Sequence, residues 1–248
     1  MAKLPLVGLQ AIVLGKKYSV ESDDVLDVVA RAGYAALECG AKDPAAFRRK
    51  LDARGLKYAG AHATPKGFGD VKGMIERLKV LGGSDVSNSG FIDWNKRTAA
   101  DAKQTIDALN AAGRELRQSG IHLHYHNHDF EFLEKIDGKM IIDVLLDGFD
   151  PDAVDLCVDV AWVTKGGLDP VEFLLKHNKQ VGYLHLKDYD DQGWTELGRG
   201  TVDLKGVIGI LPRLTGVRWV VCEQDSSRID PLESIAISRK YLRDAFNY

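Results

Sequence analysis

The sequence predicts a single (β/α)8 barrel, the fold known as a TIM barrel, and three observations support this fold class. A unit of strand, turn, helix and turn takes roughly 30 residues, so the chain of 248 residues is long enough for eight such units. A short β-rich run followed by a capped amphipathic segment recurs eight times along it. No linker, low-complexity tract or charge block interrupts this pattern. We therefore expect one domain that spans residues 1–248.

The expected strands are short apolar runs, which are typical of a parallel sheet covered by helices on its outer face. The segments between them carry helix start and stop signals: Ser22 precedes the first helix, Gly33 follows it, and Pro44 begins the second. An open doubly wound sheet would use the same units, but no glycine-rich phosphate fingerprint follows the first strand. The expected strands are residues 7–11, 35–39, 57–64, 85–89, 121–128, 154–160, 182–187 and 219–223.

Composition and charge exclude several classes of protein. Apolar residues make up 45% and charged residues 28% of the chain, and mean hydropathy is −0.18, as in ordinary globular proteins. Nucleic-acid binders usually carry a basic excess, whereas 33 Lys and Arg stand against 36 Asp and Glu here, for a net charge of −3. The apolar runs are far shorter than a membrane span. We expect neither nucleic acid nor membrane as a partner.

The cysteines and the start of the chain indicate the compartment. Cys39, Cys157 and Cys222 lie far apart in apolar runs and cannot all pair, which indicates buried thiols in a reducing environment. One lysine precedes the first apolar stretch, but no small-residue cleavage site follows that stretch. We interpret it as the first strand rather than a signal peptide. We therefore expect a cytoplasmic protein.

Four of the seven histidines fall within the fifth expected strand, at every second position. Alternate residues of a strand share one face, so the four imidazoles of this run would point the same way. A solvated outer face would explain the pattern, but imidazole is also the commonest metal ligand and a natural general base. His122, deepest in the strand, fits a packed core position; the others, with Glu131 in the following loop, are candidates for a site at the strand end. These candidates are His124, His126 and His128.

The next three strands also end in side chains that bind metals. Asp159, His185 and Glu223 each end or follow an apolar run, and in a parallel barrel such positions meet at one mouth. Each has an alternative role on its own, such as a salt bridge or a helix cap for Asp159. Together with Glu131 they form the mixed oxygen and nitrogen ligand set expected for one divalent ion such as Mn²⁺, Mg²⁺, Co²⁺ or Zn²⁺.

Other polar and aromatic residues fall at the same mouth. Trp162 and Trp194 lie in loops there and would pack against a sugar or in the core. Lys187 shares a face with His185 and would stabilise an oxyanion or pair with Asp188. Arg199 is the evident candidate for binding an anion. The first three strands end in Gln10, Glu38 and His62, which would contact substrate, although Glu38 would equally serve as the partner of an arginine.

Four segments, YHNHDFEF, LCVDVAWV, GYLHLKDY and VVCEQD, resemble the sugar phosphate isomerase/epimerase family. These xylose-isomerase-like TIM barrels include inosose dehydratase and relatives of endonuclease IV. The resemblance implies one divalent metal held by Glu131, Asp159, His185 and Glu223. The sequence departs from the family at the first ligand, because many relatives place a glutamate at the strand end itself. His124 or His126 occupies that region here, so His126 would ligate instead of Glu131 or beside it.

The resemblance implies a sugar isomerase or epimerase that removes a proton next to a carbonyl through a metal-stabilised enediolate. His126, or a ligating carboxylate such as Glu131 or Glu223, would move the proton. An alternative is a carbohydrate lyase on the same site, either a dehydratase or an enzyme that cleaves 3-keto-glycosides. A nuclease like endonuclease IV is disfavoured by the net charge of −3, and a non-catalytic sugar-binding module is a further alternative. The sugar, its phosphorylation, the identity of the metal and self-association into a homo-oligomer stay open.

Overall fold

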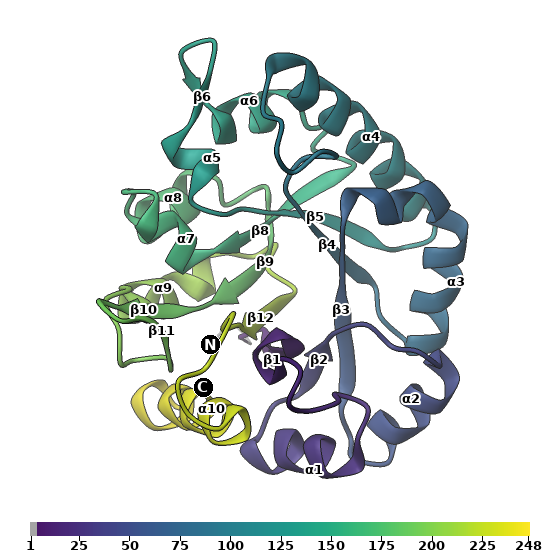
Figure 1. The fold of residues 1–248 in the computed structure, drawn as a ribbon, viewed down its shortest axis with the longest axis vertical. Helices are drawn as coiled ribbons and strands as arrows, with labels where there is room; N and C mark the ends of the chain where they lie inside the picture. Colours follow the sequence, from purple (N-terminus) through teal and green to yellow (C-terminus); the bar gives the residue numbers. More distant parts are fainter. Residues whose placement is uncertain (1–3) are drawn as a thin grey trace.

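Eight parallel strands close into a barrel, which confirms the predicted fold class (Figure 1). The computed structural model describes residues 4–248, with side chains throughout except at residues 65–67. Around the barrel the strands follow the order β1-β12-β9-β8-β5-β4-β3-β2, and β1 pairs with β12 to close it. The strands are β1 (Leu6–Gln10), β2 (Ala36–Glu38), β3 (Lys57–Ala63), β4 (Asp85–Ser89), β5 (His122–His126), β8 (Val154–Asp159), β9 (Val181–Leu186) and β12 (Trp219–Cys222).

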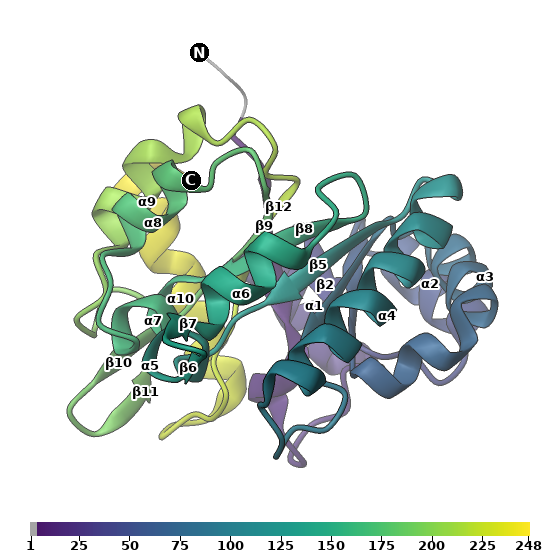
Figure 2. The same cartoon turned by 90° about the horizontal axis from the view of Figure 1, so that it is seen from above.

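Helices surround the barrel, and two short hairpins are inserted between its units. The turned view places α8, α9 and α10 on one flank and α2, α3 and α4 on the other, with the strands between them (Figure 2). The α-helices are α1 (Asp23–Ala32), α2 (Pro44–Asp52), α3 (Val71–Leu81), α4 (Ala99–Gln118), α5 (Phe130–Leu133), α6 (Ile141–Gly148), α7 (Val160–Lys165), α8 (Pro170–Lys176), α9 (Leu204–Ile210) and α10 (Pro231–Phe246). Three 3-10 helices are η1 (Ala11–Leu14), η2 (Pro65–Asp70) and η3 (Leu211–Arg213), and the hairpins pair β6 (Lys135–Ile136) with β7 (Lys139–Met140) and β10 (Asp188–Asp190) with β11 (Gly193–Thr195).

The predicted helix signals act as expected at α1. The Ser22 hydroxyl accepts a hydrogen bond from the Val25 N–H and so satisfies one of the free donors of the first turn. Gly33 ends the helix with a φ of 94°, a left-handed conformation that costs glycine little. The fifth expected strand is shorter than predicted, because it ends at His126 rather than at residue 128.

Two apolar cores hold the barrel together. The larger lies between the strands and the outer helices and includes residues from nearly every element. The smaller fills the barrel interior, where Tyr183 packs among the small side chains of Ala36, Ala59, Cys157 and Val221. Such side-chain filling is typical of a closed eight-stranded barrel. Side chains therefore fill the barrel interior below the ends of the strands.

The three cysteines are buried free thiols, as expected from their apolar surroundings. Among the described residues, every helix is too short or too polar to cross a membrane.

Candidate active site

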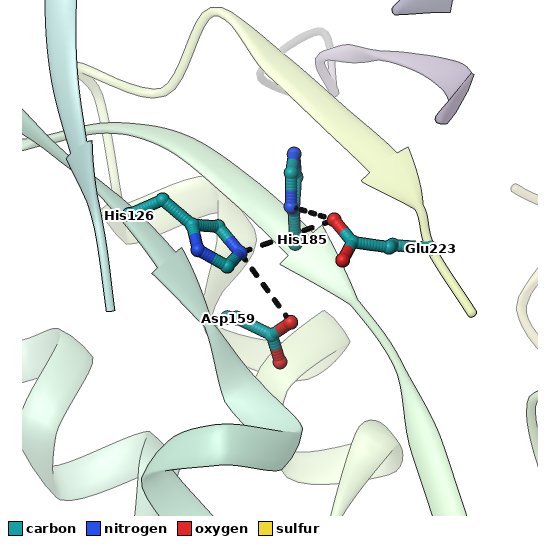
Figure 3. A group of neighbouring side chains, drawn as sticks. All are labelled: His126, Asp159, His185 and Glu223. Carbon is teal, nitrogen blue, oxygen red and sulfur yellow. Dashed lines mark ion pairs between the residues drawn. The ribbon is translucent and has the colours of Figure 1, made fainter. Parts of the chain in front are cut away.

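Four side chains converge where the strands of the second half end (Figure 3). His126 ends β5, Asp159 ends β8, His185 lies in β9, and Glu223 follows β12 directly. Parallel register brings them together, since Asp159 is paired with His185 across neighbouring strands. One nitrogen or oxygen atom from each residue lies within 4.8 Å of those of the other three. We call these four residues the ligand group.

The ligand group is buried, yet its facing atoms lack hydrogen-bond partners. These atoms are Asp159 Oδ2, Glu223 Oε2, His185 Nδ1 and both ring nitrogens of His126. His126 Nε2 lies 3.5 Å from Asp159 Oδ2 and 3.9 Å from Glu223 Oε2. Ion-pair contacts join some of these atoms, since His185 Nδ1 faces Glu223 Oε2 and Lys187 Nζ lies 3.3 Å from Asp159 Oδ2. Buried polar atoms are nearly always hydrogen-bonded in proteins, so His126, whose two ring nitrogens form no hydrogen bond, indicates a missing partner in the group. Two imidazole nitrogens and two carboxylate oxygens fit a divalent metal ion.

Two members are prepared for this role by their own surroundings. Burial lowers the pKa of His126 well below its ordinary value, which keeps the ring neutral and free to bind a metal. Asp159 caps α7 through Oδ1, which accepts from the N–H groups of Ala161 and Trp162. Its other oxygen is thereby left facing the ligand group. One carboxylate thus caps α7 with one oxygen and faces the ligand group with the other.

Glu38 supports the ligand group from beneath. Its fully buried carboxylate lies 3.0 Å from His185 Nε2 and 3.3 Å from His62 Nδ1, and Ser89 Oγ lies 2.8 Å from His62 Nε2. Burial would raise the pKa of Glu38, but the charges and hydrogen bonds of His185 and His62 outweigh burial and lower it. A carboxylate on one imidazole nitrogen orients the other toward a metal. Glu38 therefore directs His185 Nδ1 into the ligand group and is not an arginine partner.

Lys187 holds the carboxylates around it rather than facing open space. Its Nζ lies 2.9 Å from Glu223 Oε1, 3.3 Å from Asp159 Oδ2 and 2.8 Å from Asp225 Oδ1. Burial lowers the pKa of Lys187, but these carboxylates outweigh burial, led by Glu223, and the pKa rises above its ordinary value. The ammonium therefore remains charged and keeps Glu223 ionised.

Asp188, the residue after Lys187, fixes the loop that follows by accepting hydrogen bonds from its backbone. Asp188 does not pair with Lys187 but accepts hydrogen bonds from four backbone N–H groups, those of Tyr189, Gly198, Gly200 and Val202.

The structure does not bring Glu131 to the ligand group, which corrects its expected place as first ligand. Glu131 lies in α5 on the outer side of the sheet, where Tyr125 Oη donates to Oε1 and the His128 N–H donates to Oε2, each at 2.8 Å. Burial raises the pKa of Glu131 to about 8. Its position in the group is occupied by His126, the substitute that the strand pattern had left open.

The other three histidines of the predicted fifth strand lie outside the ligand group. His124 faces the amino-terminal end of the barrel, where its Nε2 lies 2.9 Å from Asp85 Oδ1, and so it is not a substrate contact as expected. His122, the expected core histidine, lies at the same end, 3.3 Å from Asp155 Oδ2. His128 lies beyond the strand and lines the cavity described next; burial lowers its pKa to about 3.

A cavity of about 520 Å³ opens onto the ligand group. Of the residues expected to contact substrate or transfer protons, five line it: Gln10, His62, His126, His128 and Glu223. Ser89 and Asp225 line it as well, and sequence reasoning missed both. Ser89 ends the fourth strand, so the search for polar residues at strand ends that selected Gln10 would also have found Ser89. Asp225 lies two residues past Glu223, beyond the strand, where that search no longer applies.

Three other expected substrate contacts lie outside the cavity lining. Trp162 and Trp194 stack edge to face, with ring centres 4.7 Å apart, and cover Lys187. Arg199 is paired with Glu196 at 3.0 Å and borders a separate surface hollow beside α10, so it is not placed to bind an anion at the ligand group. The loop carrying Arg199 turns toward α10 rather than over the barrel mouth, and no strand pattern specifies that direction.

Known proteins resemble this chain along most of its length. The family model described as the xylose isomerase-like TIM barrel matches residues 26–245. A curated inosose dehydratase from Geobacillus kaustophilus is 25% identical, over 92% of this chain and 88% of that protein.

Solved structures share the fold at lower identity. A sugar phosphate isomerase/epimerase from Parabacteroides distasonis superposes with a TM-score of 0.87 at 24% identity, covering 99% of this chain and 96% of that one. The IolI protein, solved with a bound zinc atom, gives a TM-score of 0.76 at 15% identity, covering 96% of this chain and 97% of that one.

Proposed function

The chain belongs to the xylose isomerase-like TIM barrel family, and from that premise we propose that it is a divalent-metal-dependent sugar isomerase or epimerase. The observation that carries the proposal is the ligand group, whose nitrogen and oxygen atoms face one another without hydrogen bonds beside an open cavity. An ion bound there would polarise a sugar carbonyl and stabilise the negative charge that develops when a neighbouring C–H bond is broken. With two imidazoles among four ligands, Zn²⁺, Mn²⁺ or Co²⁺ suits the group better than Mg²⁺.

Glu223 is the proposed proton carrier. It faces the cavity, and its Oε1 accepts a hydrogen bond from Lys187, which keeps the carboxylate ionised and fixed in place. The proton leaves the carbon next to the carbonyl for a Glu223 oxygen and returns from Glu223 to the neighbouring carbon in an isomerisation. In an epimerisation Glu223 keeps that proton, and a second acid or water delivers a proton to the opposite face of the same carbon. Lys187 does not line the cavity, so it acts through Glu223 and Asp225 as a positioning residue.

The remaining polar cavity residues would orient the sugar. His62 and His128 stand on the walls, and Asp225 and Ser89 add a carboxylate and a hydroxyl. Such groups pair with the hydroxyls of a sugar and place its reacting carbon near Glu223.

Two buried glutamates provide a matched test of the metal site. Purified wild-type protein should contain about one divalent ion per chain, as measured by plasma mass spectrometry. Glu223→Gln should lose that ion and Glu131→Gln should keep it, because only the first carboxylate belongs to the ligand group. Metal-free wild-type protein at saturating Mn²⁺ and Zn²⁺, or metal loss in Glu131→Gln with retention in Glu223→Gln, would contradict the proposal.

The reaction itself is tested by hydrogen exchange. The metal-loaded enzyme is incubated in D₂O with ketoses, aldoses, inososes and 3-keto-glucosides, and the products are read by NMR. Deuterium should enter at a carbon next to a carbonyl with wild-type enzyme and not with Glu223→Gln. Exchange with none of these sugars would reject proton abstraction from them.

A second candidate is a dehydratase, and the inosose dehydratases among the curated relatives favour it. The first step would be the same proton transfer to Glu223, followed by departure of a hydroxide from the adjacent carbon as water. A product lighter than its substrate by one water would identify the dehydratase, whereas a product of equal mass would identify the isomerase or epimerase.

A further inference from the structure

One wall of the cavity is apolar and is supplied by the segment that follows β1. Ile12 and Leu14 lie in η1, and Tyr18 and Val20 lie in the loop after it. We call these four residues the apolar shelf. The rest of the lining includes imidazoles and carboxylates around the ligand group, among them His62 and Glu223, so the cavity combines polar and apolar surfaces.

The apolar shelf is held in place by hydrogen bonds on both sides. Gln10 Oε1 accepts from the Ile12 N–H at 2.5 Å and caps η1. Tyr18 Oη donates to Asp230 Oδ2 at 2.8 Å, and the other oxygen of Asp230 accepts from the Leu232 N–H at the start of α10. Ile12 is nevertheless 46% exposed. Ile12 therefore presents an uncovered apolar side chain to the cavity, beside the half-buried Tyr18 and Val20, and ligand cavities are lined mainly by such apolar and aromatic side chains.

The cavity has room for more than one ring. A cavity of roughly 150 Å³ accommodates a single six-membered ring such as benzene. The cavity here is about 520 Å³, more than three times as large. A lone sugar ring placed at Glu223 would leave most of that volume unfilled.

We propose that the apolar shelf binds a second ring joined to the reacting sugar, so that the substrate is a glycoside rather than a free monosaccharide. This inference rests on the proposed function, because it places the reacting sugar at Glu223 and the ligand group. The second unit presents an apolar face, which is either the C–H face of another sugar or an aryl group. Both pack well against an aromatic side chain such as Tyr18 and an aliphatic one such as Ile12.

Binding measurements separate this inference from the reaction. Dissociation constants for the metal-loaded enzyme are measured by calorimetry with three probes: methyl 3-keto-β-glucoside, phenyl 3-keto-β-glucoside and 3-keto-cellobiose. We expect at least one two-ring probe to bind about tenfold more tightly than the methyl glycoside, equivalent to ~1.4 kcal/mol. Preference for the phenyl probe alone identifies an aryl unit, and preference for 3-keto-cellobiose alone identifies a second sugar.

Two apolar residues of equal exposure supply the variants. Ile12→Ser should abolish the preference for two rings, while its affinity for the methyl glycoside stays within twofold. Val80→Ser, on the outer side of α3, should keep the preference, because Val80 is 47% exposed but lies away from the cavity. Equal affinities of wild-type enzyme for one-ring and two-ring probes, absence of binding, or an equal loss for all three probes in Ile12→Ser would overturn the inference.

The deuterium experiment identifies which proposal has failed. Exchange without any preference for two rings would retain the proposed function and remove the role of the apolar shelf. A preference for two rings without deuterium exchange would retain the role of the apolar shelf and remove the proposed function.

Discussion

The two ends of the barrel carry the same kinds of side chain, but these side chains differ in their hydrogen bonding. At the amino-terminal end, Asp85 accepts from Arg218 at 2.7 Å and from His124 at 2.9 Å, and Ser84 also donates to it. At the carboxyl-terminal end, the facing atoms of the ligand group form no hydrogen bonds. Those of Asp159, His185 and Glu223 make ion-pair contacts only, and neither ring nitrogen of His126 has a hydrogen-bond partner. Of the amino-terminal pair, His124 Nδ1 alone is unpaired.

Arginine accounts for the difference. Arg218 and Arg117 neutralise Asp85 and Asp155 at the amino-terminal end, whereas the ligand group has one lysine, shared with Asp225, against two carboxylates. A buried polar network whose hydrogen bonds are all made stabilises the fold. Buried polar atoms without hydrogen bonds cost free energy, and binding an ion would remove that cost. His124 and His126, two residues apart on one strand, therefore serve different purposes.

The largest expected effect is on stability and tests the amino-terminal end. Arg218→Met should lower the free energy of unfolding by about 3 kcal/mol, because it leaves the buried Asp85 carboxylate without its cation. Urea denaturation measures this, and the metal content should not change. Arg114→Met is the control, since the Arg114–Asp150 pair is exposed and should be worth less than ~1 kcal/mol. Equal losses in the two variants would contradict the assignment of a structural network.

The next effect tests the carboxyl-terminal end through the same strand. His126→Gln should weaken metal binding by more than about 100-fold, beyond the 10- to 100-fold typical of residues that only support a ligand. His124→Gln should leave metal affinity within threefold and act on stability instead, because its partner is Asp85. Competition with a chelating dye measures both affinities. Similar metal loss in the two variants would remove the distinction between the ends.

A smaller effect is expected where Glu38 supports the ligand group. Glu38→Gln should weaken metal binding by about 10- to 100-fold, because the amide orients His185 less strongly than a carboxylate. NMR of the imidazole nitrogens should report a change in the tautomer of His185, a readout that loss of stability alone would not produce. Unchanged affinity together with an unchanged tautomer would leave Glu38 with a purely structural role.

The smallest effect concerns Glu131 and its pH dependence. Burial raises the pKa of Glu131 to about 8, above its unfolded value, so the folded state binds more protons between about pH 5 and pH 7.5. Its contribution to stability is therefore present at low pH and is lost as pH rises, by at most about 1.4 kcal/mol per pH unit.

Glu131→Gln cannot titrate, so the wild-type advantage over this variant should shrink as pH rises through that range. Urea denaturation at pH 5, 6, 7 and 8 measures the difference. A constant difference would mean that Glu131 is ionised throughout.

The barrel was predictable because its signals are local, repeated along the chain and consistent with one another. Asp159, His185 and Glu223 followed from the same regularity, since the ends of parallel strands meet. The prediction of Glu131 as a metal ligand was wrong because the position of Glu131 depends on how tightly the chain turns after β5. The strand ends at His126 and α5 begins at Phe130, which carries Glu131 to the outer side of the sheet. The strand pattern of β5 does not encode that turn.

Glu38 was expected as a substrate contact or arginine partner, and Lys187 as an oxyanion stabiliser or Asp188 partner. The structure instead pairs Glu38 with His185 and His62, and Lys187 with three carboxylates. Each ends an apolar strand as expected, yet which carboxylate meets which cation is decided across the barrel, between β2 and β9 or between β9 and the loop after β12. The apolar shelf was missed for a related reason. Residues 11–14 form η1, and a short 3-10 helix after a strand has no periodic signal of its own.

The hydrogen bond between Tyr18 and Asp230 joins segments from opposite ends of the chain. The last barrel strand, β12, likewise pairs with the first, β1. During synthesis on a ribosome, the wall that carries Ile12 therefore gains its support only after the segment leading into α10 has emerged from the exit tunnel. An incomplete chain that has already exposed Glu38 and His126 thus lacks both this support and the β1–β12 pairing that closes the barrel.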